Sequence, residues 1–269
     1  MKNLTKIFFA VVAGMFAFSC VNDAINDPTV EVGSSATTEI TVSLEASRTQ
    51  LGDKDAEGKY PLYWNAGDAI AVNGVASQPL AENFDGLASA SFSFNGEVAH
   101  PYNAVYPAPA EGVTAAEGLF PVTFLAEQAY TAGTFVAGAA PMYGYAEGDE
   151  LQLNHLAGVL RFAIKGEHTL SNIVITAEAP IAGNFDVNCQ TGELTAHADA
   201  SNTVTVTFGE GLALGAEATP IYVAVPAGDH GLYNIVITST DGESMVVKFN
   251  SESNPVKVAL KGIMQNLGL

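Results

Sequence analysis

Short runs of alternating apolar and polar residues constrain this chain more than any other feature of its sequence. A period of two places every second side chain on one face of a strand, and these runs are rich in β-branched and aromatic residues. Turn-forming pairs such as Asn95-Gly96 and Asp241-Gly242 separate them, at spacings typical of antiparallel sandwiches. The clearest runs lie at residues 39–45, 88–94, 203–208, 221–225, 234–240 and 245–249. We therefore expect an all-β protein, with residues 110–118 as the best candidate for a single short helix.

The first twenty residues carry the pattern of an export signal. A positively charged start is followed by the apolar stretch 7–18 and then by Cys20. Because this stretch is shorter than the roughly 20 residues that a membrane-spanning helix needs, we expect it to be removed. The small residue before Cys20 makes the site resemble a bacterial lipobox. This resemblance implies that residues 1–19 are a signal peptide and that Cys20 receives the lipid that anchors the chain in the outer membrane.

Charge and cysteine content limit the classes of partner and of cross-link. Two of the ten basic residues lie in the signal peptide, so 29 acids stand against eight bases in the mature chain, a net charge of −21. Such an acidic surface disfavours nucleic acid as a partner and keeps an exported protein soluble. Lipidation of Cys20 leaves Cys189 as the one remaining cysteine, so we expect no intramolecular disulfide and a buried, inert Cys189.

The composition changes along the chain suggest a tether followed by two domains. Residues 20–36 are polar, contain proline and glycine, and have no sustained period, which is typical of a flexible tether. The rest of the chain exceeds the usual ~100–150 residues of one domain. An acidic, glycine-bearing patch at 145–150 precedes a new apolar strand and suggests a boundary there. We expect antiparallel β-sandwich domains at 37–150 and 151–269.

Motifs for catalysis and metal binding are missing from the sequence. The histidines are scattered singly, without the spacing of zinc ligands. Residues 186–197 begin like a calcium loop, but glycine at the seventh position and histidine at the twelfth favour a β-turn. Residues 209–215 imitate a dinucleotide-binding fingerprint with one residue too many, and no G-x-S-x-G elbow occurs. We therefore expect no cofactor, no metal and no enzymatic activity.

A series of short motifs occurs in an order that is similar to a known family. They are residues 47–49 (SRT), 64–72 (WNAGDAIAV), 104–107 (AVYP), 141–144 (PMYG) and 153–162 (LNHLAGVLRF). Over about residues 48–183, with a looser similarity at 256–269, the chain resembles the fimbrillin family, the type V pilins. The resemblance implies a subunit of a surface fimbria that joins other pilin subunits by strand exchange, a form of β-augmentation. In physical terms, Gly67-Asp68 would close a turn that buries Trp64.

The resemblance also implies which residues take part in assembly. A surface protease cuts after an arginine, an N-terminal strand leaves, and a strand of a neighbour fills the groove. The matching arginine is Arg48, and cleavage there would release lipidated Cys20 together with the preceding strand. The inward residues of that strand are Ile40, Val42 and Leu44. The donor strand would most simply be the C-terminus, because a chain end can leave its sheet without unthreading the fold. Its candidate residues are Val256, Val258, Leu260, Ile263 and Leu267.

Two other interpretations remain open at this point. In the first, Arg48 only ends a strand, and the chain stays a lipid-anchored adhesin or glycan-binding lipoprotein that does not polymerise. Its ligand on a host or bacterial surface would then need an aromatic platform, for which Trp64, Tyr60, Tyr63 and Tyr102 are candidates, although the motif position of Trp64 argues for burial. In the second, the chain is a secreted hydrolase, which would need converging carboxylates or an activated nucleophile. The sequence also leaves the shaft, tip and anchor roles undecided.

Overall fold

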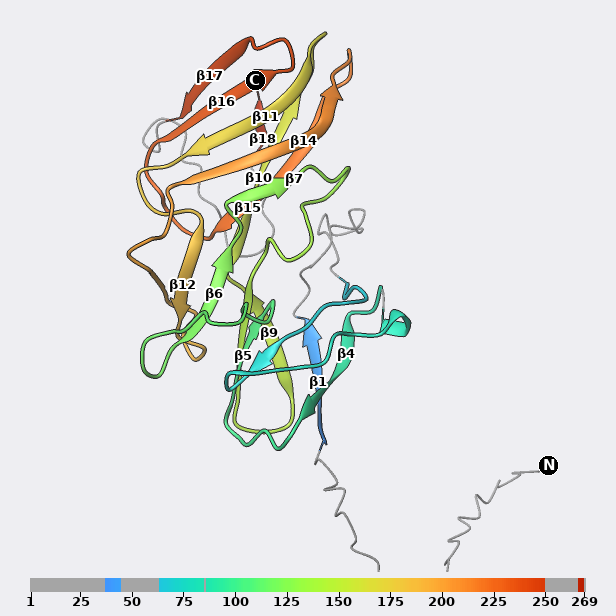
Figure 1. Cartoon of the computed structure of the whole chain (residues 1–269), viewed down its shortest axis with the longest axis vertical. Helices are drawn as coiled ribbons and strands as arrows, with labels where there is room; N and C mark the ends of the chain where they lie inside the picture. The colour runs from blue at the N-terminus through green and yellow to red at the C-terminus, as the bar shows by residue number, and fades with distance from the viewer. Residues whose placement is uncertain (1–36, 45–62, 85, 250–265, 269) are drawn as a thin grey trace, which may run out of the picture. The chain divides into compact units, whose positions relative to one another are not determined.

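The computed structural model describes residues 37–44, 63–84, 86–249 and 266–268 (Figure 1). These residues form strands joined by turns and one 3-10 turn, η1 (Glu82–Phe84), and no α-helix occurs among them. The predicted all-β class is confirmed. The signal peptide, the tether, Cys20 and Arg48 lie outside the described residues. No helix in the described ranges is long and apolar enough to cross a membrane.

The N-terminal strands form one seven-stranded sheet in the order β3-β2-β5-β8-β9-β1-β4. Within the AVYP and PMYG motifs, Tyr106 is the last residue of one of these strands and Met142 is the first residue of another. The members are β1 (Thr37–Leu44), β2 (Ala71–Val72), β3 (Val75–Ala76), β4 (Ser89–Asn95), β5 (Tyr102–Tyr106), β8 (Met142–Ala146) and β9 (Leu151–His155). Most neighbours are antiparallel, but β1 runs parallel to β9. The first strand that the structure describes, β1, lies between β9 and β4 and not at the edge of the sheet.

Three further sheets contain the remaining strands. Their orders are β17-β16-β11-β14-β7, β15-β10-β18 and β13-β12-β6. The strands are β6 (Phe120–Phe124), β7 (Glu127–Ala129), β10 (Ala157–Ile164), β11 (Thr169–Thr176), β12 (Gly183–Val187), β13 (Leu194–Ala196), β14 (Thr203–Ala213), β15 (Thr219–Pro226), β16 (Tyr233–Ser239), β17 (Ser244–Phe249) and β18 (Asn266–Gly268). Strands β16 and β17 form the hairpin predicted at Asp241-Gly242, where Gly242 has a positive φ of 88° that suits glycine.

The buried hydrophobic side chains form two clusters. The first contains Trp64, Phe92 and Met142 with the inward residues of β1, and it also includes Phe185 from β12. The second contains the inward residues of β10, β11, β14, β15 and β16. Strands β6 and β7, which precede residue 150, pair with β12 and β14, which follow it. Sheets are thus shared across the expected boundary, and the division into domains at 37–150 and 151–269 stays a prediction.

The short helix expected at residues 110–118 does not form. This segment contains separate turns, in which Val113 N–H donates to Ala110 O (3.2 Å) and, further on, Leu119 N–H donates to Ala116 O (3.0 Å). Gly112 adopts a φ of 84°, a left-handed value that interrupts a right-handed helix. The prediction was wrong because glycine at this position favours a turn over helix propagation.

A buried glutamine joins two of the sheets. Gln128 on β7 is 1% exposed, and its side-chain amide faces Ala224 on β15. Gln128 Nε2 donates to Ala224 O (2.7 Å), while Gln128 Oε1 accepts from Ala224 N–H (3.0 Å). The side chain thereby makes the two hydrogen bonds that a neighbouring strand would make with this part of β15. A buried amide is stable in this position because its donor and acceptor both have partners.

Candidate functional site at strand β1

Strand β1 contributes its apolar face to the N-terminal core. Ile40, Val42 and Leu44 are 2%, 0% and 9% exposed, while the residues between them point to solvent. Burial of three such side chains is worth about 1.5–3 kcal/mol each, or about 5–9 kcal/mol in all. This is comparable to the total stability of about 5–15 kcal/mol that is typical of a folded domain. The core therefore depends on having a strand in this position.

The backbone of β1 is bonded to strands on both sides. With β4 it pairs antiparallel from Thr37, opposite Asn95, to Ser43, opposite Ser89. With β9 it pairs parallel only from Val42 to Leu44. In Figure 1 the blue β1 arrow accordingly runs beside β4. Because β1 is the strand through which β4 joins the sheet, removal of β1 would separate β4 from β9 and leave a gap between them.

Side chains strengthen the link between β1 and β4. Thr38 Oγ1 donates to Gly96 O (2.8 Å) and accepts from Val98 N–H (3.2 Å). Farther along, Thr41 Oγ1 lies 3.1 Å from Ser91 Oγ on the exposed face. These hydrogen bonds join β1 to β4 and to the loop that follows it. A strand that replaced β1 would need to form hydrogen bonds with the same backbone groups of β4.

The motif at residues 64–72 builds the core next to β4. Trp64 is fully buried and packs edge-on against Phe92 of β4, with ring centroids 5.0 Å apart, and against Tyr106 at 5.5 Å. Tyr106 OH donates to Asp68 Oδ1 (2.8 Å), and Asn65 N–H donates to Asp68 Oδ2 (2.8 Å). Burial, together with the charge of Asp68, raises the pKa of Tyr106 well above its usual value, so its hydroxyl stays protonated. The motif is a structural support for the sheet.

The exposure of the aromatic rings tests the platform that was considered for a glycan ligand. Trp64 is buried, and Tyr102 is only 6% exposed, so neither ring presents a face to solvent. Tyr63 is 36% exposed, and Tyr60 lies outside the described residues. An open hollow of about 330 Å³ lies beside Asp68, Tyr106 and Pro107, but the contacts above already use both oxygens of this carboxylate. The candidate rings thus do not form a platform in the described part of the chain.

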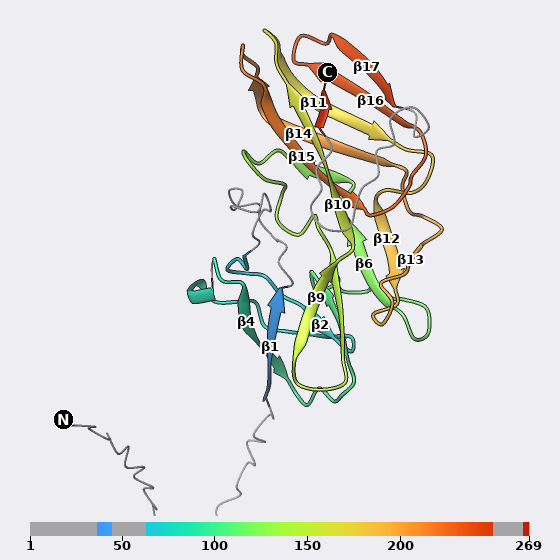
Figure 2. The same ribbon diagram turned by 180° about the vertical axis from the view of Figure 1, so that it is seen from behind.

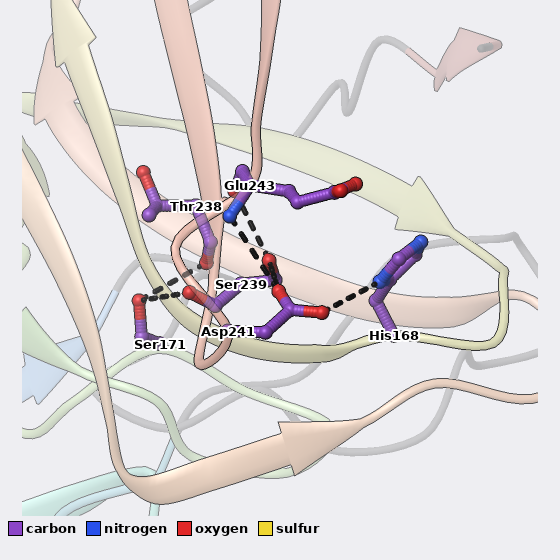
Figure 3. Close-up of polar contacts among 6 residues, drawn as sticks. All are labelled: His168, Ser171, Thr238, Ser239, Asp241 and Glu243. Carbon is purple, nitrogen blue, oxygen red and sulfur yellow. Dashed lines mark hydrogen bonds and ion pairs between the residues drawn. The ribbon is translucent and has the colours of Figure 1, made fainter.

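One group of polar residues contains the side-chain types of a hydrolase, at the turn between β16 and β17 (Figure 3). Ser239 Oγ donates to a carboxylate oxygen of Asp241 and also lies 3.0 Å from Glu243 O. His168 Nδ1 lies 3.6 Å from the other oxygen of Asp241. The serine is therefore bonded to the carboxylate and not to the imidazole, so the serine-to-histidine contact of a hydrolase triad is not formed here. The hydrogen bond from Ser239 lowers the pKa of Asp241, which fits a group that stabilises the turn.

Metal binding and thiol chemistry also find no support among the described residues. No group of three or more histidine, cysteine, aspartate or glutamate side chains lies close enough there to hold a metal ion. The calcium-like stretch forms a turn, in which Gly192 N–H donates to Asn188 O (2.7 Å). Cys189 is free and 2% exposed, and burial raises the pKa of its thiol to about 12. The low exposure confirms the expectation of a buried Cys189, and a thiol that stays protonated is a poor nucleophile.

The candidate donor residues fall mostly outside the described part of the chain. Val256, Val258, Leu260 and Ile263 lie in the undescribed stretch 250–265. Leu267 lies in β18, whose backbone pairs parallel with β10 and places Leu267 opposite Phe162. The donor role of the C-terminus and cleavage after Arg48 therefore stay predictions.

Comparisons with known proteins found matches among solved structures only. No protein-family model matches the sequence, and no curated protein matches it. A protein of Bacteroides ovatus described as a cell adhesion protein shares 15% identity with a TM-score of 0.46, over 79% of this chain and 86% of that chain. The tip fimbrial protein Mfa3 of Porphyromonas gingivalis, truncated at its C-terminus, shares 9% identity with a TM-score of 0.35, over 79% and 82%. A second B. ovatus protein, described as an adhesin, shares 9% identity with a TM-score of 0.34, over 87% and 90%. These three proteins are described as adhesion or fimbrial proteins, and each TM-score is below 0.5.

Proposed function

We propose that the chain is a structural subunit of a surface fimbria that contributes to adhesion. It is exported as a lipoprotein, held in the outer membrane through Cys20, and assembled after cleavage at Arg48 by exchange of β1 for a strand of another subunit. The observation that supports this proposal most is the position of β1. The first described strand of the chain lies between β9 and β4, supplies three apolar side chains to the core, and ends four residues before Arg48.

A single cut would then have two consequences. It frees the chain from its lipid anchor, because Cys20 lies on the same fragment as β1. It also opens an apolar gap between β9 and β4, whose backbone edges become unpaired. A strand from a neighbour can fill the gap if it offers an apolar side chain at every second position, as Ile40, Val42 and Leu44 do.

The C-terminal segment has the pattern that such a donor requires. Val256, Val258 and Leu260 alternate with Lys257, Ala259 and Lys261, so one face is apolar and the other is partly basic. The basic face suits a subunit whose surface is acidic, with 29 acids against ten bases in the whole chain. In this scheme the chain is not an enzyme, needs no cofactor, and has other pilin subunits as its partners.

The test is to recover the protein from cell surfaces and determine its intact mass and N-terminal sequence. Wild-type chains are compared with Arg48→Ala and with Lys54→Ala, a control that removes a positive charge from the same segment. We expect a mature start at Thr49 and surface polymers in the wild type and in the control, with both lost in Arg48→Ala. A lipidated Cys20 terminus in all three would contradict the proposal and favour the non-polymerising adhesin.

A further inference from the structure

Strand β17 forms an exposed outer edge of the five-stranded sheet (Figure 2). It pairs with β16 on one side, and no described strand pairs with it on the other. Proteins protect such edges with proline, bulges, very short strands or charged residues. In β17 the register is regular from Ser244 to Phe249, no proline is present, and the one charged residue is Lys248. Among the described residues, the second edge of β17 therefore has no pairing partner and none of these protective features except Lys248.

The side chains on this edge are apolar and solvent-exposed. Met245 is 47% exposed and Val246 is 56% exposed, whereas Val247 packs partly against the C-terminal core. The strand itself carries no acidic residue, although the chain as a whole has a net charge of −19. Two copies of so acidic a protein repel each other over most of their surfaces, and an edge without acids is a place where they can approach.

The register shows which amides of β17 point away from β16. Ser239 N–H donates to Glu243 O (2.9 Å), so this pair is a hydrogen-bonded one. Hydrogen-bonded and non-hydrogen-bonded pairs alternate along an antiparallel ladder. Met245 and Val247 therefore turn their amides toward β16. The outward-facing amides are those of Ser244, Val246 and Lys248.

We propose that β17 pairs antiparallel with β17 of a second copy of this chain, about a twofold axis at Val246. Val246 then lies opposite its own counterpart and Ser244 lies opposite Lys248 of the other copy, so that all three outward-facing amides find partners. A twofold interface of this kind uses the same surface on both copies. The two five-stranded sheets become one continuous sheet.

Charge selects the antiparallel arrangement over a parallel one. The turn before β17 carries Asp241 and Glu243, and the far end of the strand carries Lys248. Antiparallel pairing places each Lys248 beside the acidic turn of the other copy, whereas parallel pairing would bring like charges together. Met245 comes to lie opposite Val247 of the other copy, on the face of the C-terminal core. The exposed apolar side chains are thereby covered.

The contact is small, so the association is expected to be weak in dilute solution. One pair of six-residue strands buries less than the roughly 1,200–2,000 Å² that stable complexes bury. The fraction of copies paired through β17 should rise where copies are held close together, because a second contact between linked molecules benefits from a high effective concentration. The inference rests on β17 alone and holds whether or not β1 is exchanged.

Disulfide cross-linking tests the register directly. In the exported chain with Cys20→Ser, Val246→Cys should give a covalent dimer under mild oxidation, because Cα atoms about 5.5 Å apart suit a disulfide. Ser244→Cys chains should not cross-link alone but should do so when mixed with Lys248→Cys chains. Cys189 is buried, so the Cys20→Ser chain without an added cysteine shows the background level of cross-linking. Absence of a Val246→Cys dimer, or stronger cross-linking by Met245→Cys, would overturn the proposed pairing.

Sedimentation velocity over a range of concentrations tests the association without cysteines. Val246→Lys places two positive charges opposite each other and should raise the dimer dissociation constant at least tenfold. Leu87→Lys, at an apolar residue that is 45% exposed elsewhere, should leave it unchanged. Urea midpoints of both variants verify that folding is intact, which is expected at exposed positions. A wild-type chain that stays monomeric, or a Val246→Lys variant that dimerises as well as wild type, would overturn the inference.

Discussion

Ile40→Ala measures how much the N-terminal core depends on β1. Ile40 is 2% exposed and lies opposite Phe92 of β4, in the same core as Trp64. The change removes three carbon atoms, which is worth about 2.4 kcal/mol at about 0.8 kcal/mol per buried methylene. The cavity left behind adds to this loss, so the free energy of unfolding should fall by about 2–5 kcal/mol. The effect is a large share of a typical domain stability.

Urea unfolding followed by tryptophan fluorescence provides the assay, because Trp64 is the single tryptophan and lies in the affected core. Ser43→Ala is the matched control, since Ser43 lies in the same strand and points to solvent. It should change the free energy of unfolding by less than about 0.5 kcal/mol. The described orientation of β1, with Ile40 buried and Ser43 exposed, is refuted by either of two results. One is an Ile40→Ala change of less than about 0.5 kcal/mol in the free energy of unfolding. The other is an equal loss of stability in Ser43→Ala and Ile40→Ala.

Three further predictions concern buried polar groups. Tyr106→Phe removes the hydrogen bond to Asp68 and should lower the free energy of unfolding by about 1–3 kcal/mol in urea titrations, with a smaller loss when Asp68 is already Asn. Gln128→Leu leaves N–H and C=O of Ala224 without partners and should cost about 2–6 kcal/mol by the same assay, so a neutral result would contradict the bridge. Burial lowers the pKa of His155 from 6.5 to about 4, so the folded state binds this proton less readily than the unfolded state. The free energy of unfolding should therefore be highest above pH 6.5 and fall by up to about 3 kcal/mol as the pH drops toward 4. Unfolding curves at pH 7.5 and 4.5 should show that His155→Leu lacks this part of the loss.

Local patterns were sufficient to predict many of the strands and one hairpin, but not which distant strands pair. The alternation in 39–45 gave the buried face of β1 correctly, because side-chain direction along a strand depends only on parity. The burial of Trp64 and the hairpin at Asp241-Gly242 follow likewise from short-range turn chemistry. The parallel pairing of β1 with β9 could not be predicted in this way, since it joins residues more than 100 positions apart.

The polar contacts that were missed are also long-range. Nothing in the sequence around Gln128 indicates that its amide meets Ala224, and the pairing of Tyr106 with Asp68 joins separate motifs. A glutamine or tyrosine in or near a short strand does not by itself indicate its hydrogen-bond partner, because the partner depends on how the sheets pack. The helix expected at 110–118 failed for the opposite reason, since a local preference was given more weight than its glycines allowed.

Peptide mapping of purified surface polymers, combined with hydrogen exchange, tests the central claim most directly. If β1 is exchanged for a strand of another subunit, residues 37–48 are absent from the polymer. The amides of β4 that pair with β1 nevertheless stay protected, because a replacement strand covers them. Recovery of residues 37–48 with the polymerised subunit, or loss of protection along Ser89–Asn95, would contradict strand exchange at β1.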